Sequence, residues 1–416
     1  MVSSIQLETA DMNQRKKVMH EIANCEVCGN ENLVSVLNLG NHPLCDDLVR
    51  IGDDRVCKEY PIEILYCDRC ATAHQRFQVP KERLFSTEYH YRARMTGSVL
   101  AGMADLVSSC EQKFGSLATK TVLDIGCNDG SLLDAFKAKG CKTLGVEPTG
   151  AAADSSHDTI NGFFEESACK QILTKTKSID FITFTNVFAH IENLPELIKN
   201  LRLLISPHTV VIIENHYLGA VLDTGQFDTF YHEHPRTYSV RSFEYIADKL
   251  GLKLTDFQFT TRYGGNVRVY LSNNPFAGKQ IDESRFNLKF KELAIDASTW
   301  ILATKRLIES LVKEHGKLRA KAFPGRAAIM IKLLELSEDQ ISAVYEIKGS
   351  IKVGHYVPGT RIPILPEAEL FAQSDLSKPI VNLAWHIASE VDDNLRKNGY
   401  LGEIINIKSL PNASAS

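Results

Sequence analysis

The chain has 416 residues, of which 44% are hydrophobic and 24% are charged, with a formal net charge of −4. This charge gives no reason to expect nucleic acid as a partner, and the longest aliphatic run near a predicted strand, Val210–Ile213, is far too short to span a membrane. The first residues lack the apolar stretch of a secretory signal, so we expect a cytoplasmic protein with no membrane partner. A chain of this length predicts two or three domains.

The N-terminal part holds two C-x-x-C pairs, formed by Cys25, Cys28, Cys67 and Cys70. In a reducing compartment such pairs indicate metal binding, since ten cysteines in so long a chain are not a disulfide framework. Two pairs complete the tetrahedral four-sulfur set that zinc prefers, and the zinc would be structural because protein fills every position. A redox-active or simply buried pair is the alternative, and Cys45 and Cys57 are substitute ligands.

The middle of the chain opens with TVLDIGCNDGSLL, an apolar strand that runs into a glycine turn and then a helix. Gly126 and Gly130 let the backbone approach a ligand closely. The spacing is not that of a dinucleotide-binding turn, and Asp124 and Asp129 would repel a pyrophosphate but suit a cationic amino-acid moiety. This favours S-adenosylmethionine. A second strand ends in Glu147, which we expect to accept both ribose hydroxyls.

Further strands follow in the order that a doubly wound sheet requires, at residues 180–186 and 209–214. The first of them ends at Asn186 and His190, on the edge where open α/β sheets bind ligands. His190 is equally expected as a core or edge histidine with a satisfied hydrogen bond. The residues expected to bind the cofactor are Asp124, Gly126, Cys127, Asn128, Gly130, Glu147, Asn186 and His190.

The segment FDTFYHEHPRTY at Phe227–Tyr238 combines imidazoles, carboxylates and phenols that a fold does not require. A histidine titrates near neutral pH, and a neighbouring Glu or Tyr can fix its tautomer or raise its basicity. The segment therefore predicts a proton-transfer site, with an exposed loop that only looks like a metal site as the alternative. The alternation in residues 264–271 predicts a late strand, half of an antiparallel pair that closes the sheet.

The C-terminal part begins with a long amphipathic helix predicted from about Ser284 to Lys317. Its apolar positions recur at helical spacing and are Phe286, Phe290, Leu293, Ala297, Trp300, Leu307 and Leu311. Such a stripe is more typical of core packing than of a cofactor site. Alternating strands and helices follow, with Val344–Glu346 at the end of a strand and a turn-rich loop at residues 354–360.

The ordered motifs resemble those of the three-domain sugar C-methyltransferases, along almost the whole chain. The matching stretches are the C-x-x-C pairs, VLDIGCNDGSLL, EPT, NVFAHI, FDTFYHEH, GGNVRVY and VGHYVPGTRIPI. These enzymes methylate C3 of a nucleotide-linked 4-keto-6-deoxyhexose. The resemblance implies an α/β fold with a zinc-knuckle domain at 1–90, a class I (Rossmann-like) methyltransferase domain at 91–280, and a C-terminal α/β Rossmann-like domain at 281–416 that closes the nucleotide-sugar site.

The resemblance also implies roles for single residues. It carries zinc ligation to the two cysteine pairs and S-adenosylmethionine binding to the glycine turn and Glu147. The residues that it assigns to catalysis are Tyr91, Tyr231, Glu233 and His234. The residues expected to bind substrate are Tyr89, His232 and Arg268, and the sequence does not decide whether Tyr89 or Tyr91 reaches the substrate. We expect a dTDP-linked sugar, with GDP or CDP as alternatives, and a monomer or weak dimer.

The predicted chemistry follows from the residue types. Methylating a carbon needs a carbanion equivalent, and a proton next to a ketone can be removed if the enolate oxygen is stabilised. His234 is the expected base at C3, with Glu233 to orient it and with Tyr231 and Tyr91 as hydrogen-bond donors to the oxyanion. His232 is the competing base. This scheme requires no catalytic metal.

Three stretches depart from the family pattern and leave the nucleotide open. Residues 322–326 read AFPGR where relatives tend to have a Gly/Ala-rich turn, Glu346 replaces a usual aspartate, and His42–Asp47 differs from Gln-Pro-Leu-Ala-Asn. Two other functions stay open. An O- or N-methyltransferase would use the same cofactor site without a base for a carbon acid. A non-catalytic zinc module on a degenerate methyltransferase is the other alternative, against which the intact glycine turn and Glu147 argue.

Overall fold

The computed structural model describes residues 19–85, 92–274 and 279–408. They form two compact units. Unit 1 comprises the described residues of Met1–Val34, Leu65–Ala220 and Glu233–Phe286, and unit 2 those of Ser35–Ile64, Val221–His232 and Asn287–Ser416. Two internal segments, 35–64 and 221–232, thus fall in unit 2. The division into domains at 1–90, 91–280 and 281–416 stays a prediction.

Unit 1 is built on a seven-stranded sheet in the order β13-β14-β11-β10-β7-β8-β9. The strands are β7 (Thr121–Ile125), β8 (Lys142–Glu147), β9 (Asp158–Asn161), β10 (Phe181–Thr185), β11 (Val210–His216), β13 (Lys253–Thr260) and β14 (Asn266–Ser272). β14 is antiparallel to both of its neighbours, so the predicted late antiparallel strand is confirmed. The strand order reverses between β7 and β10, and this reversal defines the point where doubly wound sheets bind ligands.

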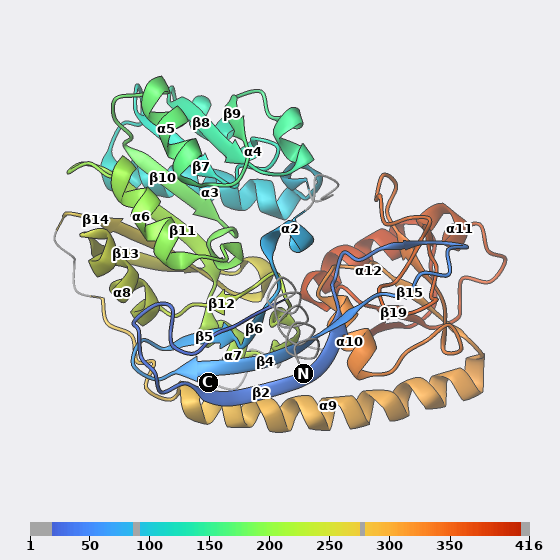
Figure 1. Ribbon diagram of the computed structural model, residues 1–416. Helices are drawn as coiled ribbons and strands as arrows, with labels where there is room; N and C mark the ends of the chain where they lie inside the picture. The colour runs from blue at the N-terminus through green and yellow to red at the C-terminus, as the bar shows by residue number, and fades with distance from the viewer. Residues whose placement is uncertain (1–18, 86–91, 275–278, 409–416) are drawn as a thin grey trace, which may run out of the picture. The chain divides into compact units, whose positions relative to one another are not determined.

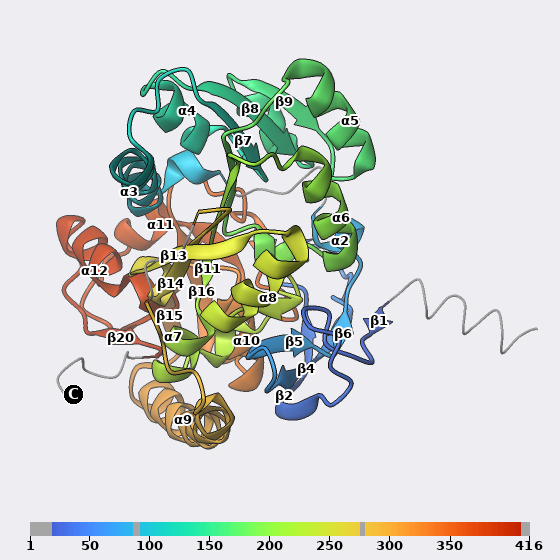
Figure 2. The ribbon, with the colours of Figure 1, turned by 90° about the vertical axis from the view of Figure 1, so that its left-hand side faces the viewer.

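Helices cover both faces of this sheet (Figures 1 and 2). On one face lie α3 (Gly97–Phe114) and α4 (Ser131–Lys137), and on the other lie α5 (Glu166–Lys175), α6 (Leu194–Leu204) and α8 (Val240–Leu250). Leu132, Leu133 and Phe136 of α4 are fully buried in the core, as predicted for the helix after the glycine turn. Burial of each such side chain stabilises the fold by about 1.5–3 kcal/mol, which fixes α4 behind the turn.

The remaining elements of unit 1 are short. β1 (His20–Glu21) pairs with β6 (Phe77–Gln78), and β5 (Thr72–Gln75) pairs with β12 (Arg236–Thr237), both antiparallel. The others are α2 (Lys81–Leu84) and the 3₁₀ turns η1 (Ala93–Met95), η2 (Gly150–Asp154), η3 (Phe188–His190) and η5 (Arg262–Gly264). Four elements contain residues of both units, namely β2 (Val34–Pro43), β4 (Glu59–Cys67), α7 (Leu218–Asp223) and α9 (Phe286–His315).

Unit 2 contains a five-stranded parallel sheet in the order β18-β16-β15-β19-β20. Its strands are β15 (Leu318–Lys321), β16 (Ile341–Glu346), β18 (Ile364–Pro366), β19 (Ile380–Asn382) and β20 (Ile404–Asn406). The order reverses between β15 and β19, so unit 2 has a switch point of its own. Both units are therefore α/β, which confirms the predicted fold class.

Four helices belong to unit 2, together with the small antiparallel pair β3 (Val49–Arg50) and β17 (His355–Tyr356) and the turns η4 (Phe227–Thr229) and η6 (Trp385–Ile387). The helices are α9 (Phe286–His315), whose first residue falls in unit 1, α10 (Ala327–Leu333), α11 (Glu367–Phe371) and α12 (Ala388–Lys397). α9 confirms the predicted long helix. Leu307, assigned to its buried stripe, is instead 46% exposed, because Ile308 takes the buried position. Among the described helices, none combines the length and the apolar character that crossing a membrane requires.

Candidate methyl-donor site, zinc site and histidine cluster

Four cysteine sulfurs cluster in unit 1. They belong to the predicted zinc ligands Cys25, Cys28, Cys67 and Cys70, and all lie within 4.8 Å of one another. Cys25 and Cys70 approach to 3.4 Å and Cys28 and Cys67 to 3.5 Å, a spacing compatible with four thiolates around one tetrahedral ion. Cys45 and Cys57, the substitute ligands, lie in unit 2 and outside this cluster, so the sequence alternative is wrong.

The surroundings of the cluster fit a bound zinc ion. The amide of Cys28 donates to Cys25 Sγ at 3.4 Å, and Asn30 Nδ2 donates to Cys67 Sγ at 3.5 Å. Hydrogen bonds among the thiols lower the pKa of Cys67 and raise those of Cys25 and Cys70, so binding of zinc must displace protons from the cluster. The four residues would hold zinc with no open coordination position, so the metal would cross-link two turns.

The glycine turn after β7 needs its glycines for two reasons. Gly126 and Gly130 have φ angles of 72° and 80°, which favour glycine. In addition, a Cβ on Gly126 would lie 2.5 Å from a methyl group of Val187, and one on Gly130 would lie 2.7 Å from Ser155 Oγ. The turn is tight because the amides of Gly126 and Cys127 both donate to the carbonyl of Val146, at 2.8 and 3.1 Å.

Two asparagines at the same edge of the sheet have left-handed backbone angles. Asn128 follows β7 with φ 50°, and Asn186 follows β10 with φ 55°. Asn128 Oδ1 accepts from the amide of Ala93 at 3.0 Å, and Asn186 Oδ1 accepts from Asn266 Nδ2 at 2.9 Å. Strain of this kind clusters at functional sites. Its position at the switch point between β7 and β10 supports a ligand site there.

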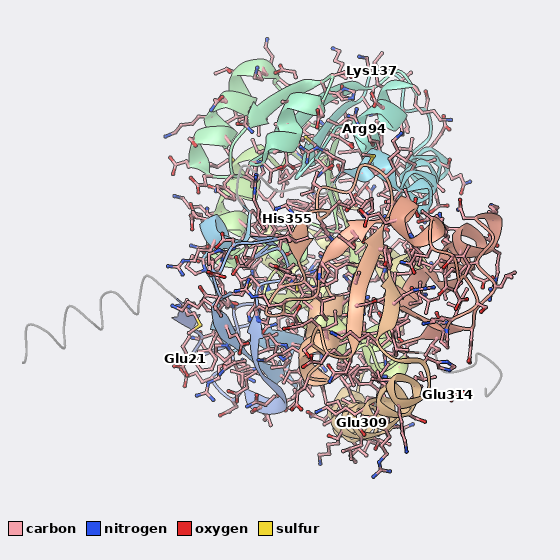
Figure 3. The ribbon with its side chains drawn as sticks, turned by 90° about the vertical axis from the view of Figure 1, so that its right-hand side faces the viewer. Glu21, Arg94, Lys137, Glu309, Glu314 and His355 are labelled. Atoms are coloured by element: carbon pink, nitrogen blue, oxygen red, sulfur yellow. The ribbon has the colours of Figure 1, made fainter. Side chains whose placement is uncertain are left out.

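The two aspartates of the turn differ in their partners. Asp129 accepts from Arg94 Nε at 3.0 Å, so its charge is balanced within the protein; Arg94 is labelled in Figure 3. Asp124 is buried and accepts from the neutral hydroxyl of Thr183 at 2.7 Å. Burial raises the pKa of Asp124 to about 7. Asp124 is therefore the carboxylate whose ionisation a cationic ligand would favour.

Glu147 is buried at the end of β8, and protein donors already occupy much of its carboxylate. Oε1 accepts from the amide and the hydroxyl of Thr149, at 2.9 and 2.6 Å, and Oε2 accepts from the amide of Asn128 at 2.9 Å. A carboxylate oxygen has two lone pairs. Only Oε2 therefore retains capacity for a ligand in this arrangement. The contact with both ribose hydroxyls stays a prediction.

Three histidine rings lie together in unit 1. The ring centroid of His234 is 4.9 Å from that of His190 and 5.2 Å from that of His216. His190 Nδ1 donates to the backbone carbonyl of Glu233 at 2.8 Å, because a carbonyl can only accept. Burial lowers the pKa of His190 to about 4, so its ring is neutral near pH 7. His190, expected at the cofactor edge, thus also contacts the predicted base.

Sequence reasoning missed two members of this cluster. His216 is the last residue of β11, and the ring of Tyr263 lies 5.8 Å from it. Tyr263 has φ 54°, a further strained residue beside the cluster. The position of His216 at the carboxyl end of a strand was a usable signal. Nothing in the local sequence marks Tyr263, because its ring reaches His216 only through the pairing of β14 with β11.

His232 lies in a different environment in unit 2. Its Nε2 donates to the carbonyl of Tyr60 at 3.1 Å, and burial lowers its pKa to about 4. A base with so low a pKa is poorly matched to proton abstraction near neutral pH. Tyr231, in the same unit, is half-buried. His234 lies instead in the histidine cluster of unit 1, and the choice between His234 and His232 as the base stays a prediction.

Of the remaining residues predicted to contact substrate, the structure describes Arg268 alone. Arg268 on β14 is 1% exposed, and it donates to Glu214 at 2.7 Å and to Asp105 at 2.9 Å. Its partners in the structure are carboxylates of the protein, and a contact with substrate stays a prediction. Tyr89 and Tyr91 lie outside the described residues.

At the switch point of unit 2, the chain fills the carboxyl edge with its own side chains. Arg326, at the start of α10, donates to both carboxylate oxygens of Asp228, at 2.7 and 2.9 Å, and to Thr229 Oγ1 at 2.7 Å. Trp385, which follows β19, donates from Nε1 to Asp228 at 3.0 Å. Asp228 is completely buried. Arg326 is the last residue of the AFPGR stretch, so this departure from the family pattern has a structural role.

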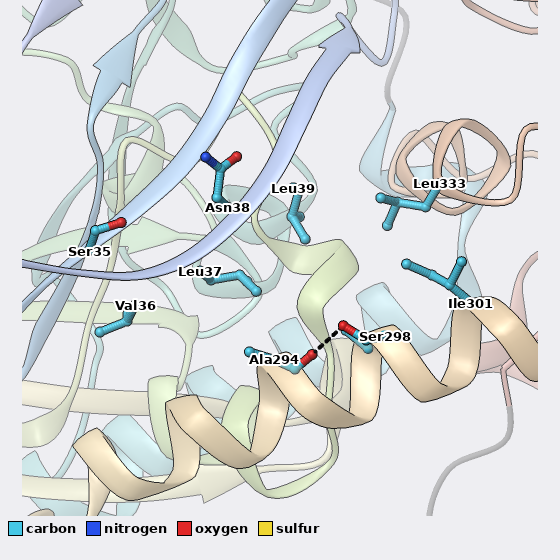
Figure 4. Close-up of a pocket in the computed structure, with 10 residues that line it drawn as sticks. Ser35, Val36, Leu37, Asn38, Leu39, Ala294, Ser298, Ile301 and Leu333 are labelled. Atoms are coloured by element: carbon cyan, nitrogen blue, oxygen red, sulfur yellow. Dashed lines mark hydrogen bonds between the residues drawn. The ribbon is translucent and has the colours of Figure 1, made fainter.

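Unit 2 also contains a cavity of about 350 Å³ between β2, α9 and α10 (Figure 4). Its lining residues are Ser35, Val36, Leu37, Asn38, Leu39, Ala294, Ala297, Ser298, Ile301 and Leu333. None of these lining residues titrates, and the hydroxyl of Ser298 donates to the carbonyl of Ala294 on its own helix. The cavity offers no group for proton transfer or for charge recognition.

Three family models match successive parts of the chain. Residues 25–85 match the "Putative zinc binding domain", residues 91–256 match the "Methyltransferase domain", and residues 263–405 match the "C-methyltransferase C-terminal domain". The chain belongs to the S-adenosylmethionine-dependent C-methyltransferases. The cysteine cluster and the glycine turn of this C-methyltransferase lie within the first and second matched segments, which confirms zinc and S-adenosylmethionine as its cofactors.

Individual proteins resemble this C-methyltransferase to different extents. The C-methyltransferase NovU of Streptomyces niveus is 25% identical over 394 residues, which cover 91% of this chain and 93% of NovU. Among solved structures, the PH0226 protein of Pyrococcus horikoshii OT3 is 14% identical, covering 46% of this chain and 98% of its own, with a TM-score of 0.34. Magnesium protoporphyrin IX methyltransferase of Synechocystis PCC 6803 is 12% identical, covering 42% and 83%, with a TM-score of 0.32. Neither structural likeness supports a conclusion about this chain.

Proposed function

We propose that this C-methyltransferase methylates C3 of a nucleotide-linked 4-keto-6-deoxyhexose by way of an enolate. The observation that carries the proposal is the histidine cluster: His234 is buried between two other imidazoles, and the ring of His190, which burial keeps neutral, donates to the carbonyl of Glu233. A carbon acid can be methylated only after a base has removed its proton, and the match of residues 263–405 to the "C-methyltransferase C-terminal domain" supports carbon as the acceptor. The ordered motifs that resemble sugar C-methyltransferases support the choice of substrate.

In this proposal each polar residue has a distinct role. His234 removes the C3 proton, and Glu233, through its position next to His234, helps to orient that ring. Tyr231 donates a hydrogen bond to the oxygen that gains charge as the C–H bond breaks. The glycine turn, Asp124 and Glu147 hold S-adenosylmethionine, which supplies an electrophilic methyl group when bound. The zinc ion supplies a cross-link between the two cysteine pairs.

Solvent deuterium exchange tests the base separately from methyl transfer. The protein is incubated in D₂O with a panel of dTDP-, GDP- and CDP-linked 4-keto-6-deoxysugars and S-adenosylhomocysteine, and C3 deuteration is followed by NMR and mass spectrometry. We expect exchange in the parent protein. His234→Ala should lose about 10²–10⁴ in the rates of exchange and of methylation, because a general base contributes a factor of that size.

Two further variants assign the roles within the segment. Tyr231→Phe and Glu233→Gln should retain part of both rates, since supporting groups usually contribute less than the base. If His232→Ala abolishes exchange while His234→Ala preserves it, the base is His232. A methyl ether or methylamine product from any substrate of the panel would replace the proposal with O- or N-methylation.

A further inference from the structure

Arg236 lies two residues after His234 and is completely buried. All of its side-chain nitrogens donate. Nε donates to the hydroxyl of Tyr238 at 2.9 Å, Nη1 to the carboxylate of Glu26 at 2.5 Å, and both Nη atoms to the carbonyl of Glu192 at 3.2 Å. Nη2 also donates to the carbonyl of Ile191. The one carboxylate in this set is that of Glu26.

One end of this network belongs to the zinc knuckle. Glu26 directly follows the ligand Cys25 in the first C-x-x-C turn. Gln78 Nε2 also donates to the carboxylate of Glu26, at 2.8 Å. The buried ring of His74 lies between Glu26 and the cysteine cluster. Its Nδ1 is 3.7 Å from Glu26 Oε2, and its Nε2 is 3.3 Å from Cys25 Sγ. The position of Glu26 therefore depends on the geometry of the cysteine turn.

The other end of the network belongs to the histidine cluster. Ile191 and Glu192 directly follow His190, whose ring contacts His234 and whose Nδ1 donates to the carbonyl of Glu233. The amide of His190 donates to the carbonyl of Val187 at 2.8 Å, which closes the turn η3. The carbonyls that Arg236 holds thus fix the end of the turn that presents the His190 ring.

Strand pairing reinforces the same connection. Arg236 pairs with His74 in the antiparallel contact of β12 with β5, and the amide of Gln75 donates to the carbonyl of Pro235 at 2.8 Å. Pro235 directly follows His234. A buried guanidinium is costly unless its partners are placed well. An apolar residue would fill the space at lower cost but could not fix two carbonyls and a carboxylate in one geometry.

We propose that Arg236 is a positioning residue that makes the geometry of the His190–His234 pair depend on zinc in the knuckle. Zinc fixes the turn that contains Glu26, Glu26 orients Arg236, and Arg236 holds the carbonyls of Ile191 and Glu192. Loss of zinc therefore loosens the turn η3 as well as the knuckle. The importance of this coupling for catalysis rests on the proposed function, whereas the coupling itself does not.

Hydrogen–deuterium exchange of the full chain, followed by mass spectrometry of the peptides covering residues 186–193, tests the coupling without any substrate. Chelation of zinc from the parent protein should speed exchange in these peptides about tenfold or more, since hydrogen bonds that close the turn are released. Glu26→Gln with one bound zinc should show the same increase before chelation, and chelation should then add little. Zinc content is measured by elemental analysis in every sample.

Two variants make the result decisive. Arg236→Lys lies outside the knuckle and keeps the charge but not the planar fork, so it should also speed exchange in 186–193. Arg76→Gln is the control, because it breaks the exposed pair of Arg76 with Glu21 and should behave as the parent does. Zinc-loaded Glu26→Gln or Arg236→Lys with parental exchange at 186–193 would overturn the proposal, as would a parent protein whose exchange there ignores chelation.

Kinetics then connect the coupling to catalysis. In the methylation assay Arg236→Lys should lower kcat about tenfold or more and should change the KM for S-adenosylmethionine much less, because the network reaches His190 but none of the glycine turn, Asp124 and Glu147. Equal losses in both parameters would indicate general damage and would contradict a positioning role. If no nucleotide sugar is methylated but the exchange results are as expected, the proposed function fails and the coupling stands.

Discussion

The two units contain the same arrangement of a doubly wound sheet but treat its switch point differently. In unit 1 the order reverses between β7 and β10, and in unit 2 it reverses between β15 and β19. At the first edge the chain places a tight glycine turn and two strained asparagines, Asn128 and Asn186. At the second it places Asp228, Arg326 and Trp385, which bind one another.

The turn after the first strand explains this difference. Gly126 and Gly130 contribute no side chain, so the backbone after β7 can come close to a ligand. The corresponding turn after β15 has Phe323 and Arg326, and the amide of Phe323 donates to Glu346 at the end of β16. The two sequence departures, AFPGR and Glu346, therefore form one internal structure. Topology creates a crevice at the switch point, and the side chains decide whether a ligand or the protein fills it.

We expect the largest effect from breaking the pair of Asp228 with Arg326 at the switch point of unit 2. Asp228→Asn removes the charge that balances buried Arg326, and we expect a loss of about 3–5 kcal/mol in the free energy of unfolding, measured by chemical denaturation. Asp223→Asn, which breaks a more exposed pair with Lys289 in the same unit, should cost less than about 1 kcal/mol. Similar losses in the two variants would show that the Asp228 cluster is not the structural centre of this edge.

The stability that the pair of Asp228 with Arg326 contributes depends on pH, and the pKa of Asp228 gives the sign of this dependence. Burial alone would raise the pKa of Asp228, but Arg326 lowers it below the ordinary value. A carboxyl with a lowered folded-state pKa contributes stability above its unfolded pKa, and that stability is lost as pH falls through the folded-state value. Acid should therefore destabilise the parent more steeply than Asp228→Asn.

At the switch point of unit 1, Asp124 should give stability the opposite dependence on pH. Burial raises the pKa of Asp124 to about 7, so the folded protein loses stability as pH rises from the unfolded value towards 7. Asp124→Asn should remove this loss and stabilise the ligand-free protein by about 2–4 kcal/mol at pH 8, at about 1.4 kcal/mol for each pKa unit. Thermal unfolding between pH 5 and 8, without cofactor, measures the effect.

Asp124→Asn should also weaken binding of S-adenosylmethionine, because the amide cannot balance a cationic group. The control is Asp158→Asn, which changes an exposed residue paired with Lys175. It should alter neither the stability at pH 8 nor the affinity for S-adenosylmethionine. An Asp124 variant no more stable than the parent at pH 8 would show that its carboxyl is not strained by burial.

We expect the smallest change in free energy from a substitution of Glu147. Glu147→Gln should weaken S-adenosylmethionine binding by about 1.5–3 kcal/mol, roughly ten- to a hundredfold, because a charged acceptor is replaced by a neutral one. Isothermal titration calorimetry measures the change, with Glu165→Gln as a partly exposed control that should bind as the parent does. Unchanged affinity would mean that the protein donors of Glu147, Thr149 and Asn128, use its carboxylate fully.

Features with a strict local geometry could be predicted from the sequence. The spacing of the cysteine pairs requires tight turns that bring sulfurs together, and the four Sγ atoms do cluster. The apolar period predicted α9, whose ends differ from the prediction by only a few residues. The strand, glycine turn and helix at residues 121–137 also followed from local pattern, because steric limits on φ leave few alternatives.

Long-range contacts could not be predicted in this way. The partners of Arg268, the approach of Tyr263 to His216 and the carbonyl bonds of Arg236 join residues that no periodicity relates. Each depends on which strands pair and in which register, as in the pairing of β14 with β11 and of β12 with β5. Burial then fixes the chemistry of these groups, since a charge without water needs a partner wherever the fold provides one.

By itself the sequence determined the α/β class, the cysteine cluster of the zinc site and the glycine turn after β7, because these follow from residue spacing over short stretches of chain. The tertiary structure alone decided that one switch point is filled by Asp228 and Arg326, that His190 and His216 flank His234, and that Arg236 joins the zinc knuckle to this cluster. These contacts arise from the folding of distant segments onto one another, where low dielectric and close packing select specific partners.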